Sequence, residues 1–413
     1  MFSFISRLSA VGILIVGVAL QAEESWPQFL GPHRDGTSTD VLGLKWGQEG
    51  PSVRWKREVG QGFAGPAVEH GKVILYHRLA DKDVLECMQS TNGVTVWKYE
   101  TPSTYSDDFG FDEGPRAVPT IVGKEIYTLG ADGLLNSVEL SSGKLRWSVK
   151  LREKFSADKG FFGMACAPVV SSDLLLVNAG GKSGYGLVAF RRTDGSVAWH
   201  VGNDEAGYSS PVLATINGEE LALFFTRAGL TVVRPKSGEV TASFPWRSRT
   251  HGSVNAAAPL VLGDLIFLSS SYETGAVLLR YAKGVLEKVW SKDRVLSSHY
   301  ATSVLRAGFL YGFDGRQEQR PTLTCVKFST GDSAWREESI GSGTILSAAN
   351  TLVVMMESGE LLLVEPSSRG FKKLAQAQVL PNGVRAYPAL ADGFLYARSK
   401  NQLYCVDLRP AKP

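Results

Sequence analysis

Polar side chains recur three residues ahead of the prolines that open strand-like segments. Arg116, Tyr208 and Arg385 hold this place, His299 holds the equivalent place in a segment without the proline, and Asn255 lies beside another. Two guanidinium groups can clamp a carboxylate through paired hydrogen bonds. Tyr208 and Asn255 can add hydrogen bonds, and His299 can act as a base. We therefore predict a ligand or cofactor site formed by Arg116, Tyr208, Asn255, His299 and Arg385. A plainer interpretation stays open, in which these residues cap strand ends and hold channel water.

A second candidate is the acidic stretch 107–113, which places four carboxylates within seven residues. Carboxylate oxygens on a loop suit Ca²⁺. The spacing departs from the Asp-x-Asp-x-Asp-Gly loop, and acidic surface loops are common, so we predict no metal ligand here. The six histidines lack zinc-ligand spacing, and no Gly-x-Ser-x-Gly, phosphate loop or dinucleotide fingerprint occurs. No catalytic residue is predicted.

The elements that must position these side chains repeat along the chain. Residues 134–147 form a hairpin pattern, with a strand, a short Gly turn and a second strand ending in Trp147. The pattern Gly-x-x-x-Trp recurs, with looser versions, at spacings of 44 to 52 residues, at Trp97, Trp147, Trp199, Trp246, Trp290 and Trp335. A four-stranded unit of this length cannot bury both faces alone and must stack on copies of itself. The repeat predicts an all-β propeller with almost no helix.

The units count to eight blades, with seven as the alternative because one unit lacks its tryptophan. In that unit we expect Phe371 or Leu374 to take the tryptophan's place. The C-terminus supplies only three strands, whereas Val53–Glu58 reads as a lone fourth strand ending near Trp55. We predict that this N-terminal strand completes the last blade and closes the ring. The longest connections join one blade to the next, so they should gather on one face around the channel mouth.

The N-terminal residues divide into two parts before the propeller of 53–413. Residues 1–22 have the pattern of a secretion signal, with Arg7, an apolar run over 10–20 and Ala22 as a small residue for cleavage. This predicts a periplasmic or secreted protein, with an uncleaved anchor as the alternative. Residues 23–52 predict an extended lead-in that packs on the outside of the scaffold.

Composition excludes some classes of function. The 413 residues carry a formal charge of only +3, and their scattered basic residues form no aromatic-interleaved run, so we predict no nucleic-acid partner. Cys87, Cys325 and Cys405 fall at equivalent positions of their repeats. This placement favours three separate blade cores over disulfide pairing.

Three segments with the Gly-x-x-x-Trp pattern resemble the tryptophan-docking repeats of pyrroloquinoline-quinone (PQQ)-like propellers, namely Asn92–Trp97, Ser142–Trp147 and Asp194–Trp199. That superfamily includes eight-bladed quinoprotein alcohol dehydrogenases and the outer-membrane assembly factor BamB. The stretches Trp26-Pro-Gln-Phe-Leu-Gly-Pro and Tyr208-Ser-Ser-Pro211 resemble secreted PQQ-like repeat proteins of planctomycete-type bacteria. The resemblance implies that each docking tryptophan stacks between neighbouring blades.

Several departures separate the chain from the enzymes of that superfamily. The dehydrogenase repeats carry an Asp before the turn, and here that place holds Gln89, Glu139 or Arg192. The methanol-oxidising enzymes have an adjacent pair of cysteines, and no two cysteines are adjacent here. No counterpart of the Ca²⁺-linked Asp base can be picked out. The resemblance therefore implies a monomeric, non-catalytic binding or assembly scaffold for a protein or peptide partner in the cell envelope, without membrane insertion after signal cleavage. The alternative is a PQQ-dependent alcohol dehydrogenase with PQQ and Ca²⁺ over the channel. A carbohydrate-binding propeller, motivated by Trp and Tyr content, is a third possibility.

Overall fold

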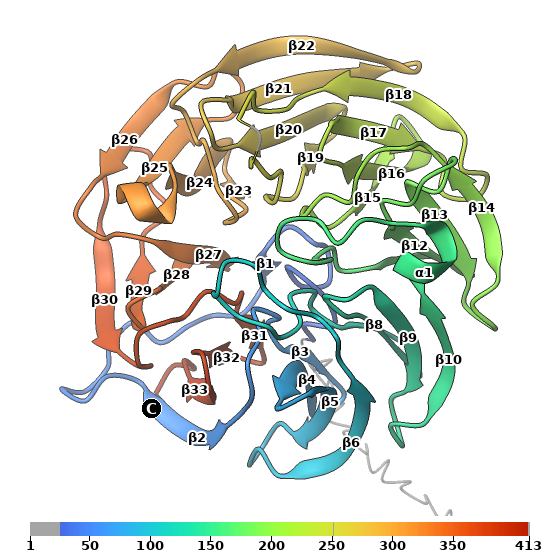
Figure 1. Ribbon diagram of the computed structural model, residues 1–413. Helices are drawn as coiled ribbons and strands as arrows, with labels where there is room; N and C mark the ends of the chain where they lie inside the picture. Colours follow the sequence, from blue (N-terminus) through green and yellow to red (C-terminus); the bar gives the residue numbers. More distant parts are fainter. Residues whose placement is uncertain (1–24, 251, 412–413) are drawn as a thin grey trace, which may run out of the picture.

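Eight blades of four antiparallel strands stand around a central channel in the computed structural model of this protein (Figure 1). The structure describes residues 25–250 and 252–411, so the predicted signal segment 1–22 lies outside the described residues. Helix is confined there to α1 (Leu151–Phe155) and the 3₁₀ turn η1 (Gln317–Gln319). No helix of the described residues is long and apolar enough to cross a membrane. The predicted all-β, eight-bladed propeller is confirmed, and the seven-bladed alternative is wrong.

Each of the first four blades is a meander whose strands run from the channel outward. Blade 1 contains β3 (Ala67–Glu69), β4 (Lys72–Leu79), β5 (Lys82–Gln89) and β6 (Thr95–Pro102). Blade 2 contains β7 (Thr120–Val122), β8 (Glu125–Leu129), β9 (Leu134–Glu139) and β10 (Leu145–Lys150). Blade 3 contains β11 (Val169–Ser171), β12 (Leu174–Asn178), β13 (Leu187–Arg191) and β14 (Val197–Val201). Blade 4 contains β15 (Val212–Ile216), β16 (Glu219–Phe225), β17 (Gly229–Val233) and β18 (Val240–Pro245).

The remaining blades repeat this order, and the last one takes its outer strand from the N-terminal part of the chain. Blade 5 contains β19 (Leu260–Leu262), β20 (Leu265–Ser270), β21 (Gly275–Ala282) and β22 (Val285–Lys292). Blade 6 contains β23 (Val304–Arg306), β24 (Phe309–Asp314), β25 (Thr322–Lys327) and β26 (Ser333–Glu337). Blade 7 contains β27 (Gly343–Ala348), β28 (Thr351–Met356), β29 (Glu360–Val364) and β30 (Lys373–Gln378). Blade 8 contains β31 (Ala389–Ala391), β32 (Phe394–Arg398), β33 (Gln402–Asp407) and β2 (Ser52–Glu58).

The ring is closed by pairing the two ends of the propeller. β2 pairs antiparallel with β33, which places Trp55 opposite Cys405. The predicted closure by Val53–Glu58 is therefore confirmed. Closure removes two exposed sheet edges that would otherwise offer unpaired backbone groups to other chains.

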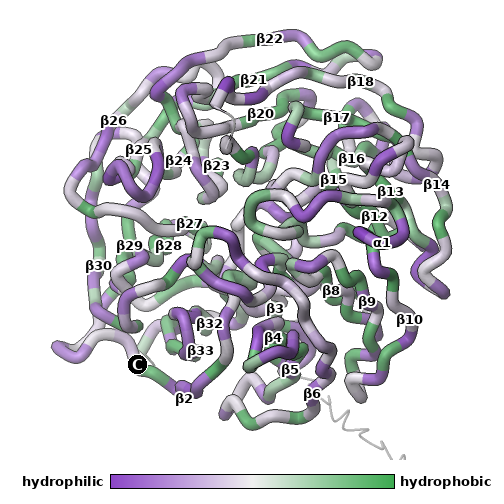
Figure 2. Tube along the Cα trace, viewed as in Figure 1, coloured by the Kyte–Doolittle hydropathy of each residue, from purple (hydrophilic) through white to green (hydrophobic). Residues whose placement is uncertain are grey.

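Burial follows the position of a strand within its blade. The second strands are the most buried, and β8 and β12 are buried at every residue, because both of their faces meet a neighbouring blade. In the outermost strands, such as β6 and β22, exposed residues are interspersed with partly buried ones. Figure 2 shows the same gradient, with hydrophobic residues concentrated in the inner strands and hydrophilic ones frequent at the rim. The core is thus a set of interfaces between blades, which is the reason a single blade cannot fold alone.

Tryptophans join neighbouring blades in a repeated way. The indole N–H of Trp97 donates to the Leu140 carbonyl of the next blade, and a Cβ added to Gly143 would lie 2.5 Å from the Trp97 ring. Gly143 has φ +72°, so this turn needs glycine both for its conformation and for the approach of the ring. The same indole-to-carbonyl bond is made by Trp55, Trp147, Trp199, Trp290 and Trp335.

Two docking positions were predicted wrongly. In the strand register the docking tryptophan faces the third strand beside a bulge, as Trp97 faces Cys87. Blade 4 has Ala242 at that place, opposite Val232, and Trp246 lies four residues further on. Blade 7 has Ala375 there, opposite Leu363, in place of the expected Phe371 or Leu374. The error arose because alanine replaces tryptophan at both places; in blade 4 the spacing alone would have marked Ala242, which stands four residues after the docking glycine Gly238.

The cysteines behave as the repeat predicted. Cys87, Cys325 and Cys405 pair with docking tryptophans in blades 1, 6 and 8, and all four cysteines are buried free thiols. Their shared register shows that each packs as a small apolar residue in its own blade.

The lead-in was expected to pack on the outside, and it does so only near its end, where Gly50 lies against Ala377 of the outer strand β30. Its first part lies elsewhere. It crosses one mouth of the channel, where β1 (Thr37–Ser38) pairs parallel with β27 and Trp26 forms a bridge with Val68 (Figure 1). The buried Arg34 guanidinium enters the channel and donates to the carbonyl oxygens of Pro168 and, at 2.8 Å, Pro211. The segment closes this mouth because its backbone and Arg34 supply partners to inner-strand groups that face the channel.

Candidate functional site

A cavity of about 520 Å³ occupies the channel mouth opposite the lead-in. Arg116, Tyr208, His299 and Arg385 of the predicted site line it. The residues at the same place in three further blades line it too, namely Phe63, Ala165 and Ala256. The blades are equivalent in space, so equivalent sequence positions converge on the axis. Asn255 is not among the lining residues. Whether any of these residues binds a ligand stays a prediction.

Of the two arginines predicted for the site, Arg385 has the more exposed side chain. Its side chain is 31% exposed and forms an ion pair of 3.5 Å with Glu357, in the loop between β28 and β29. The guanidinium lies 5.9 Å from the ring centroids of both Phe63 and Phe111. Stacking on two rings holds the group in place while its remaining N–H donors face the cavity.

Arg116 has a different environment. Its side chain is only 6% exposed, donates to the carbonyls of Gly114 (2.5 Å) and Asp112 (2.7 Å), and lies 3.7 Å from the Asp107 carboxylate. Its ring contact is closest with Tyr105, at 4.6 Å. Because its donors are engaged by the loop that precedes it, Arg116 shapes the cavity wall. The predicted two-arginine clamp is therefore reduced to one open guanidinium, that of Arg385.

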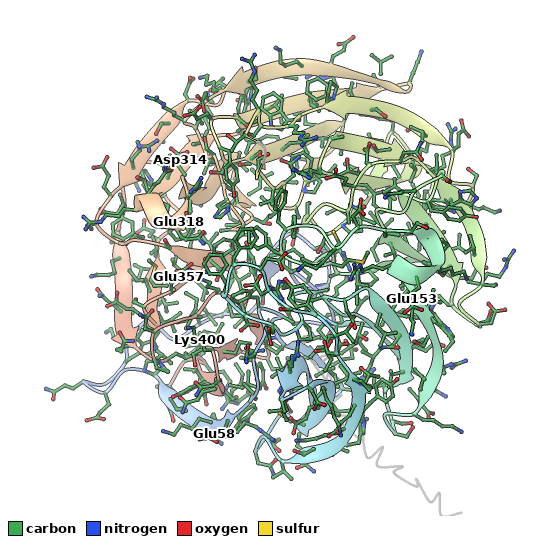
Figure 3. The ribbon with its side chains drawn as sticks, viewed as in Figure 1. Glu58, Glu153, Asp314, Glu318, Glu357 and Lys400 are labelled. Atoms are coloured by element: carbon green, nitrogen blue, oxygen red, sulfur yellow. The ribbon has the colours of Figure 1, made fainter. Side chains whose placement is uncertain are left out.

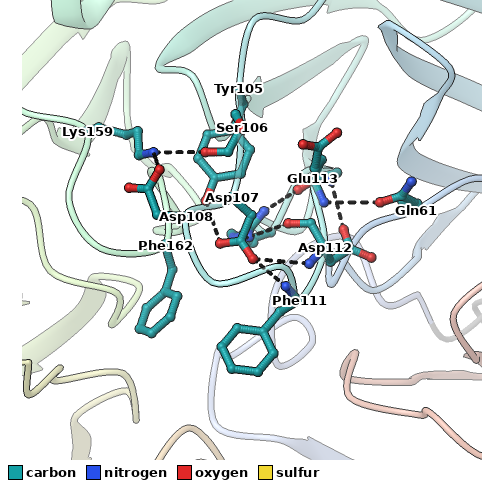
Figure 4. A network of polar contacts seen from close by, with 12 residues as sticks. Gln61, Tyr105, Ser106, Asp107, Asp108, Phe111, Asp112, Glu113, Lys159 and Phe162 are labelled. Carbon is teal, nitrogen blue, oxygen red and sulfur yellow. Dashed lines mark hydrogen bonds and ion pairs between the residues drawn. The ribbon is translucent and has the colours of Figure 1, made fainter.

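The acidic stretch 107–113 is a hydrogen-bonded loop (Figure 4). The Asp107 carboxylate accepts the N–H of Phe111 at 2.5 Å, and the Asp112 carboxylate accepts the N–H groups of Gly62 and Gly114. Lys159, from the next long loop, binds Asp108 at 2.7 Å. These carboxylates fold the loop, since their oxygens already receive donors from the protein. No group of three His, Cys, Asp or Glu side chains suited to a metal ion occurs in the described residues.

This loop carries an aromatic group that the sequence analysis did not select. Phe109 and Phe111 are 51% and 48% exposed, and their ring centroids are 6.3 Å apart. Phe162 joins them at 5.1 Å from Phe109 and stacks edge-on against Tyr208. We call Phe109, Phe111 and Phe162 the aromatic rim. Half-exposed aromatic rings beside a cavity are typical of sites that bind an apolar group.

Tyr208 and Asn255 support the far wall of the cavity. The Tyr208 hydroxyl accepts the N–H of Phe162 at 2.9 Å, and burial raises its pKa. Asn255 is buried, and its amide N–H₂ donates to the carbonyls of Thr226 and Trp246 while its backbone carbonyl accepts the N–H of Tyr208. Asn255 therefore joins blades 4 and 5 beneath the cavity and does not present its side chain to a ligand.

His299 takes part in a short hydrogen-bonded chain. Its Nδ1 lies 2.5 Å from Gln317 Oε1 and its Nε2 lies 2.8 Å from the Tyr272 hydroxyl. Because an amide oxygen only accepts, Nδ1 carries the proton and Nε2 accepts from Tyr272. Burial lowers the pKa of His299, which keeps the ring neutral near neutral pH. Both ring nitrogens are engaged, so His299 positions Tyr272 and has no free nitrogen with which to act as a base.

The charges of the cavity favour an anionic group without a metal. Arg116, Arg316 and Arg385 line it together with one carboxylate, Glu318, which Arg316 approaches at 3.3 Å. Glu318 and the nearby Glu357 are labelled in Figure 3. Since Glu318 is paired, the lining offers no oxygen-rich donor set for Ca²⁺. The residues present can thus stack on a flat or apolar ligand and bind its carboxylate, but they do not match the calcium half of a quinoprotein centre.

The side chains missed by the sequence analysis come from loops. Phe109, Phe111 and Phe162 lie in the two long connections expected at this face, so exposed aromatics in those loops were a usable signal. Tyr272 and Arg316 lie in hairpin connections of blades 5 and 6, and Arg316 stacks 4.8 Å from the Tyr272 ring. No repeat position marks them, because turns within a blade vary independently of its packing.

Comparison with solved structures places the fold among known propellers. BamB from Moraxella catarrhalis is 14% identical with a TM-score of 0.64, covering 88% of this chain and 99% of that one. Quinohemoprotein alcohol dehydrogenase from Comamonas testosteroni is 13% identical with a TM-score of 0.64, covering 94% and 81%. The computationally designed Ika8 protein is 11% identical with a TM-score of 0.59, covering 86% and 99%. At these identities the likeness concerns the fold alone, which a binding factor and an enzyme share.

The family is established by the sequence itself. No protein of curated function matches the chain significantly. A family model described as outer membrane protein assembly factor BamB, built from PQQ-like repeats, matches residues 80–337. That match covers more than half of the 413 residues and runs from the second half of blade 1 to the end of blade 6. The chain therefore belongs to the BamB-like family of PQQ-repeat propellers.

Proposed function

We propose that this protein is a non-catalytic propeller of the periplasm or cell exterior that binds a peptide segment of a cell-envelope partner in the cavity described above. The observation that carries the proposal is the aromatic rim, which stands beside the guanidinium of Arg385. An apolar side chain would enter among the rings, and a carboxylate would pair with Arg385. The family description as an outer membrane assembly factor supports the location and the kind of partner.

The site supports binding better than chemistry. Each titratable group that could take or give a proton is engaged: His299 by Tyr272 and Gln317, and Glu318 by Arg316. A general base needs a free lone pair within hydrogen-bond reach of its substrate. The cavity instead offers apolar area, arginine side chains and fixed walls, which are the features of a recognition pocket.

Selection from a random peptide library displayed with free C-termini on the full chain tests this proposal. We expect enriched peptides with an aromatic or large apolar residue next to a carboxylate. Enrichment should disappear for Arg385→Gln and for Phe111→Ser, which remove the cation and one rim ring without touching blade packing. Arg369→Gln, an exposed arginine of blade 7 away from the cavity, is the matched control. Selection of the same peptides by all four proteins would refute the proposal.

A second candidate is a PQQ-dependent alcohol dehydrogenase, and one observation favours it. The cavity lies on the propeller axis and combines Arg385 with the flat ring faces of Phe63 and Phe111, which suits a planar, carboxylate-bearing quinone. When bound, that quinone would supply the two-electron oxidising chemistry. Phe63 and Phe111 would stack on it and Arg385 would hold a carboxylate, but a Ca²⁺ ligand set is not provided by the lining residues.

A further inference from the structure

The lead-in binds channel-facing backbone groups of three inner strands. Trp26 and Val68 exchange two hydrogen bonds of 2.8 Å, Ile121 donates its N–H to Pro27, and Ser347 donates its N–H to Gly36. The three inner-strand residues Val68, Ile121 and Ser347 therefore receive backbone partners from one extended segment.

These three residues hold the same place in their blades. Each stands one residue before the pair that closes the first hairpin, which is Glu69 with Lys72 in blade 1 and Val122 with Glu125 in blade 2. In antiparallel strands, backbone groups point alternately to the partner strand and away from it. The residue before a hydrogen-bonded closing pair thus directs its N–H and C=O into the channel.

The equivalent places in blades 3 to 6 lack such a segment. They are Val170, Thr215, Val261 and Leu305. All four line a second cavity, of about 640 Å³, beside the lead-in. Across residues 25–250 and 252–411, no backbone hydrogen bond outside the blade sheets involves the N–H of any of the four. The channel edge of these strands is open where the lead-in does not reach.

We propose that this second cavity is a binding groove for an extended peptide segment of a partner, which pairs with the channel edge of β15. β15 has five residues, whereas β11, β19 and β23 have three each, so it offers two outward-directed residues, Leu213 and Thr215. Both line the cavity. Strand addition of this kind takes its affinity from main-chain hydrogen bonds and its selectivity from alternate side chains. The lead-in shows that the fold accepts extended chain on these edges.

The surroundings specify an uncharged segment with short apolar side chains. Val170, Leu213 and Val261 flank the edge, and Leu262 stands at the rim with half of its side chain exposed. The nearest charges are already engaged, because Arg34 binds channel carbonyls and Asp35 accepts the N–H and hydroxyl of Thr37. An anionic occupant would find no free guanidinium or ammonium group in the lining, and the side chains that flank the edge itself are apolar.

The groove is separate from the cavity of the proposed function. Phe29 of the lead-in lines the first cavity and packs edge-on against Tyr387, whereas Gln28 and Arg34 line the second. The lead-in lies between them, so ligands of the two cavities do not touch. The two proposals can therefore fail independently.

Methyl NMR of the full chain tests the groove with a defined probe, an acetylated and amidated Thr-Val-Thr-Val-Thr peptide. We expect shifts at the methyl groups of Val170, Leu213 and Val261, and none at Val118 and Val254, which line the first cavity. A peptide N-methylated along one edge has the same side chains without those amide donors, and it should cause no shifts. This comparison does not depend on any protein variant.

Two variants locate the contact on β15. Thr215→Pro removes an N–H that faces the channel and is not needed by β16, so the strand can be kept. It should weaken the peptide about tenfold, whereas Thr215→Ala, which keeps the N–H, should bind like the natural protein. Absence of shifts at the three groove methyls, equal binding of the N-methylated peptide, or equal affinity of the two variants would overturn the proposal.

Discussion

At the scale of single residues, tryptophans join neighbouring blades through the same indole-to-carbonyl contact in most of the blades. Trp97 donates its indole N–H to the next blade and covers the Gly143 turn, while Trp246 lies beyond its docking place, and its indole nitrogen has no partner among the described residues. The sequence predicts these contacts where Gly-x-x-x-Trp is intact. It fails at Ala242 and Ala375 because alanine stands there in place of the tryptophan that identifies the docking position.

Replacing Trp97 and Trp246 in turn shows whether stability comes from the indole-to-carbonyl contact or only from the presence of an aromatic ring. Trp97→Ala should lower the free energy of unfolding by about 3 kcal/mol, because it empties a blade interface and leaves the Leu140 carbonyl without its donor. Trp246→Ala should cost about 1 kcal/mol or less. Urea unfolding of both variants measures the difference. Equal losses would show that the indole-to-carbonyl bond is not what joins the blades.

At the scale of elements, the junction between blades 8 and 1 combines strand pairing with a buried ionic network. Glu86 of β5 accepts from Arg57 of the closing strand at 2.8 Å and from Thr95, and it lies 3.1 Å from His77. Burial alone would raise the pKa of Glu86, but hydrogen bonds from His77 and Thr95 and the charge of Arg57 lower it to about 2. Burial lowers the pKa of His77. The closing strand could be predicted from the incomplete termini, whereas this network could not, because it depends on which side chains face one another across the junction between the two blades.

The network should make the junction sensitive to acid. A lowered Glu86 pKa gives stability that is present above about 4.5 and is lost as the pH falls toward about 2. A lowered His77 pKa acts in the same direction below 6.5, because the unfolded chain then takes up the proton more readily. Glu86→Gln should lower the free energy of unfolding by roughly 3 kcal/mol at neutral pH and by much less near pH 3.

Denaturant unfolding at the two pH values checks this expectation. Glu100→Gln is a suitable control, because Glu100 pairs with Lys82 on the exposed face of the same blade and should matter little at either pH. A Glu86→Gln deficit that does not shrink in acid would mean that packing, and not ionisation, is responsible.

At the scale of the whole molecule, the lead-in divides the channel into two separate cavities. Its position could not be predicted, because it binds backbone edges of blades 1, 2 and 7, which no side-chain pattern identifies. The first cavity was predictable in part: the repeat placed Tyr208, His299 and Arg385 around one mouth, but the roles of Arg116 and Asn255 depend on loop contacts. Those contacts arise only after the chain has folded.

Arg34 should be essential to this arrangement. Burial lowers the pKa of its guanidinium to about 9, and the group stays charged at neutral pH while it donates to carbonyls of blades 3 and 4. Arg34→Ala leaves the Pro211 carbonyl unpaired and removes one of the two donors to the Pro168 carbonyl, which also accepts the Thr120 hydroxyl, so it should lower the free energy of unfolding by about 3 kcal/mol. Arg54→Ala, on the exposed closing strand, should change it by no more than about 0.5 kcal/mol. Equal effects of the two variants in urea unfolding would contradict this role for Arg34.

The central claim is that the first cavity is a recognition pocket and not a quinone enzyme centre. Calorimetric titration of the full chain with PQQ, with and without Ca²⁺, tests it most directly, since Ca²⁺ dependence reports on a donor set that the lining residues do not provide. We predict that any binding of PQQ is the same with and without Ca²⁺ and is weakened in Arg385→Gln. Micromolar binding that requires Ca²⁺, together with dye-linked alcohol oxidation by the loaded protein, would contradict the account and establish the dehydrogenase.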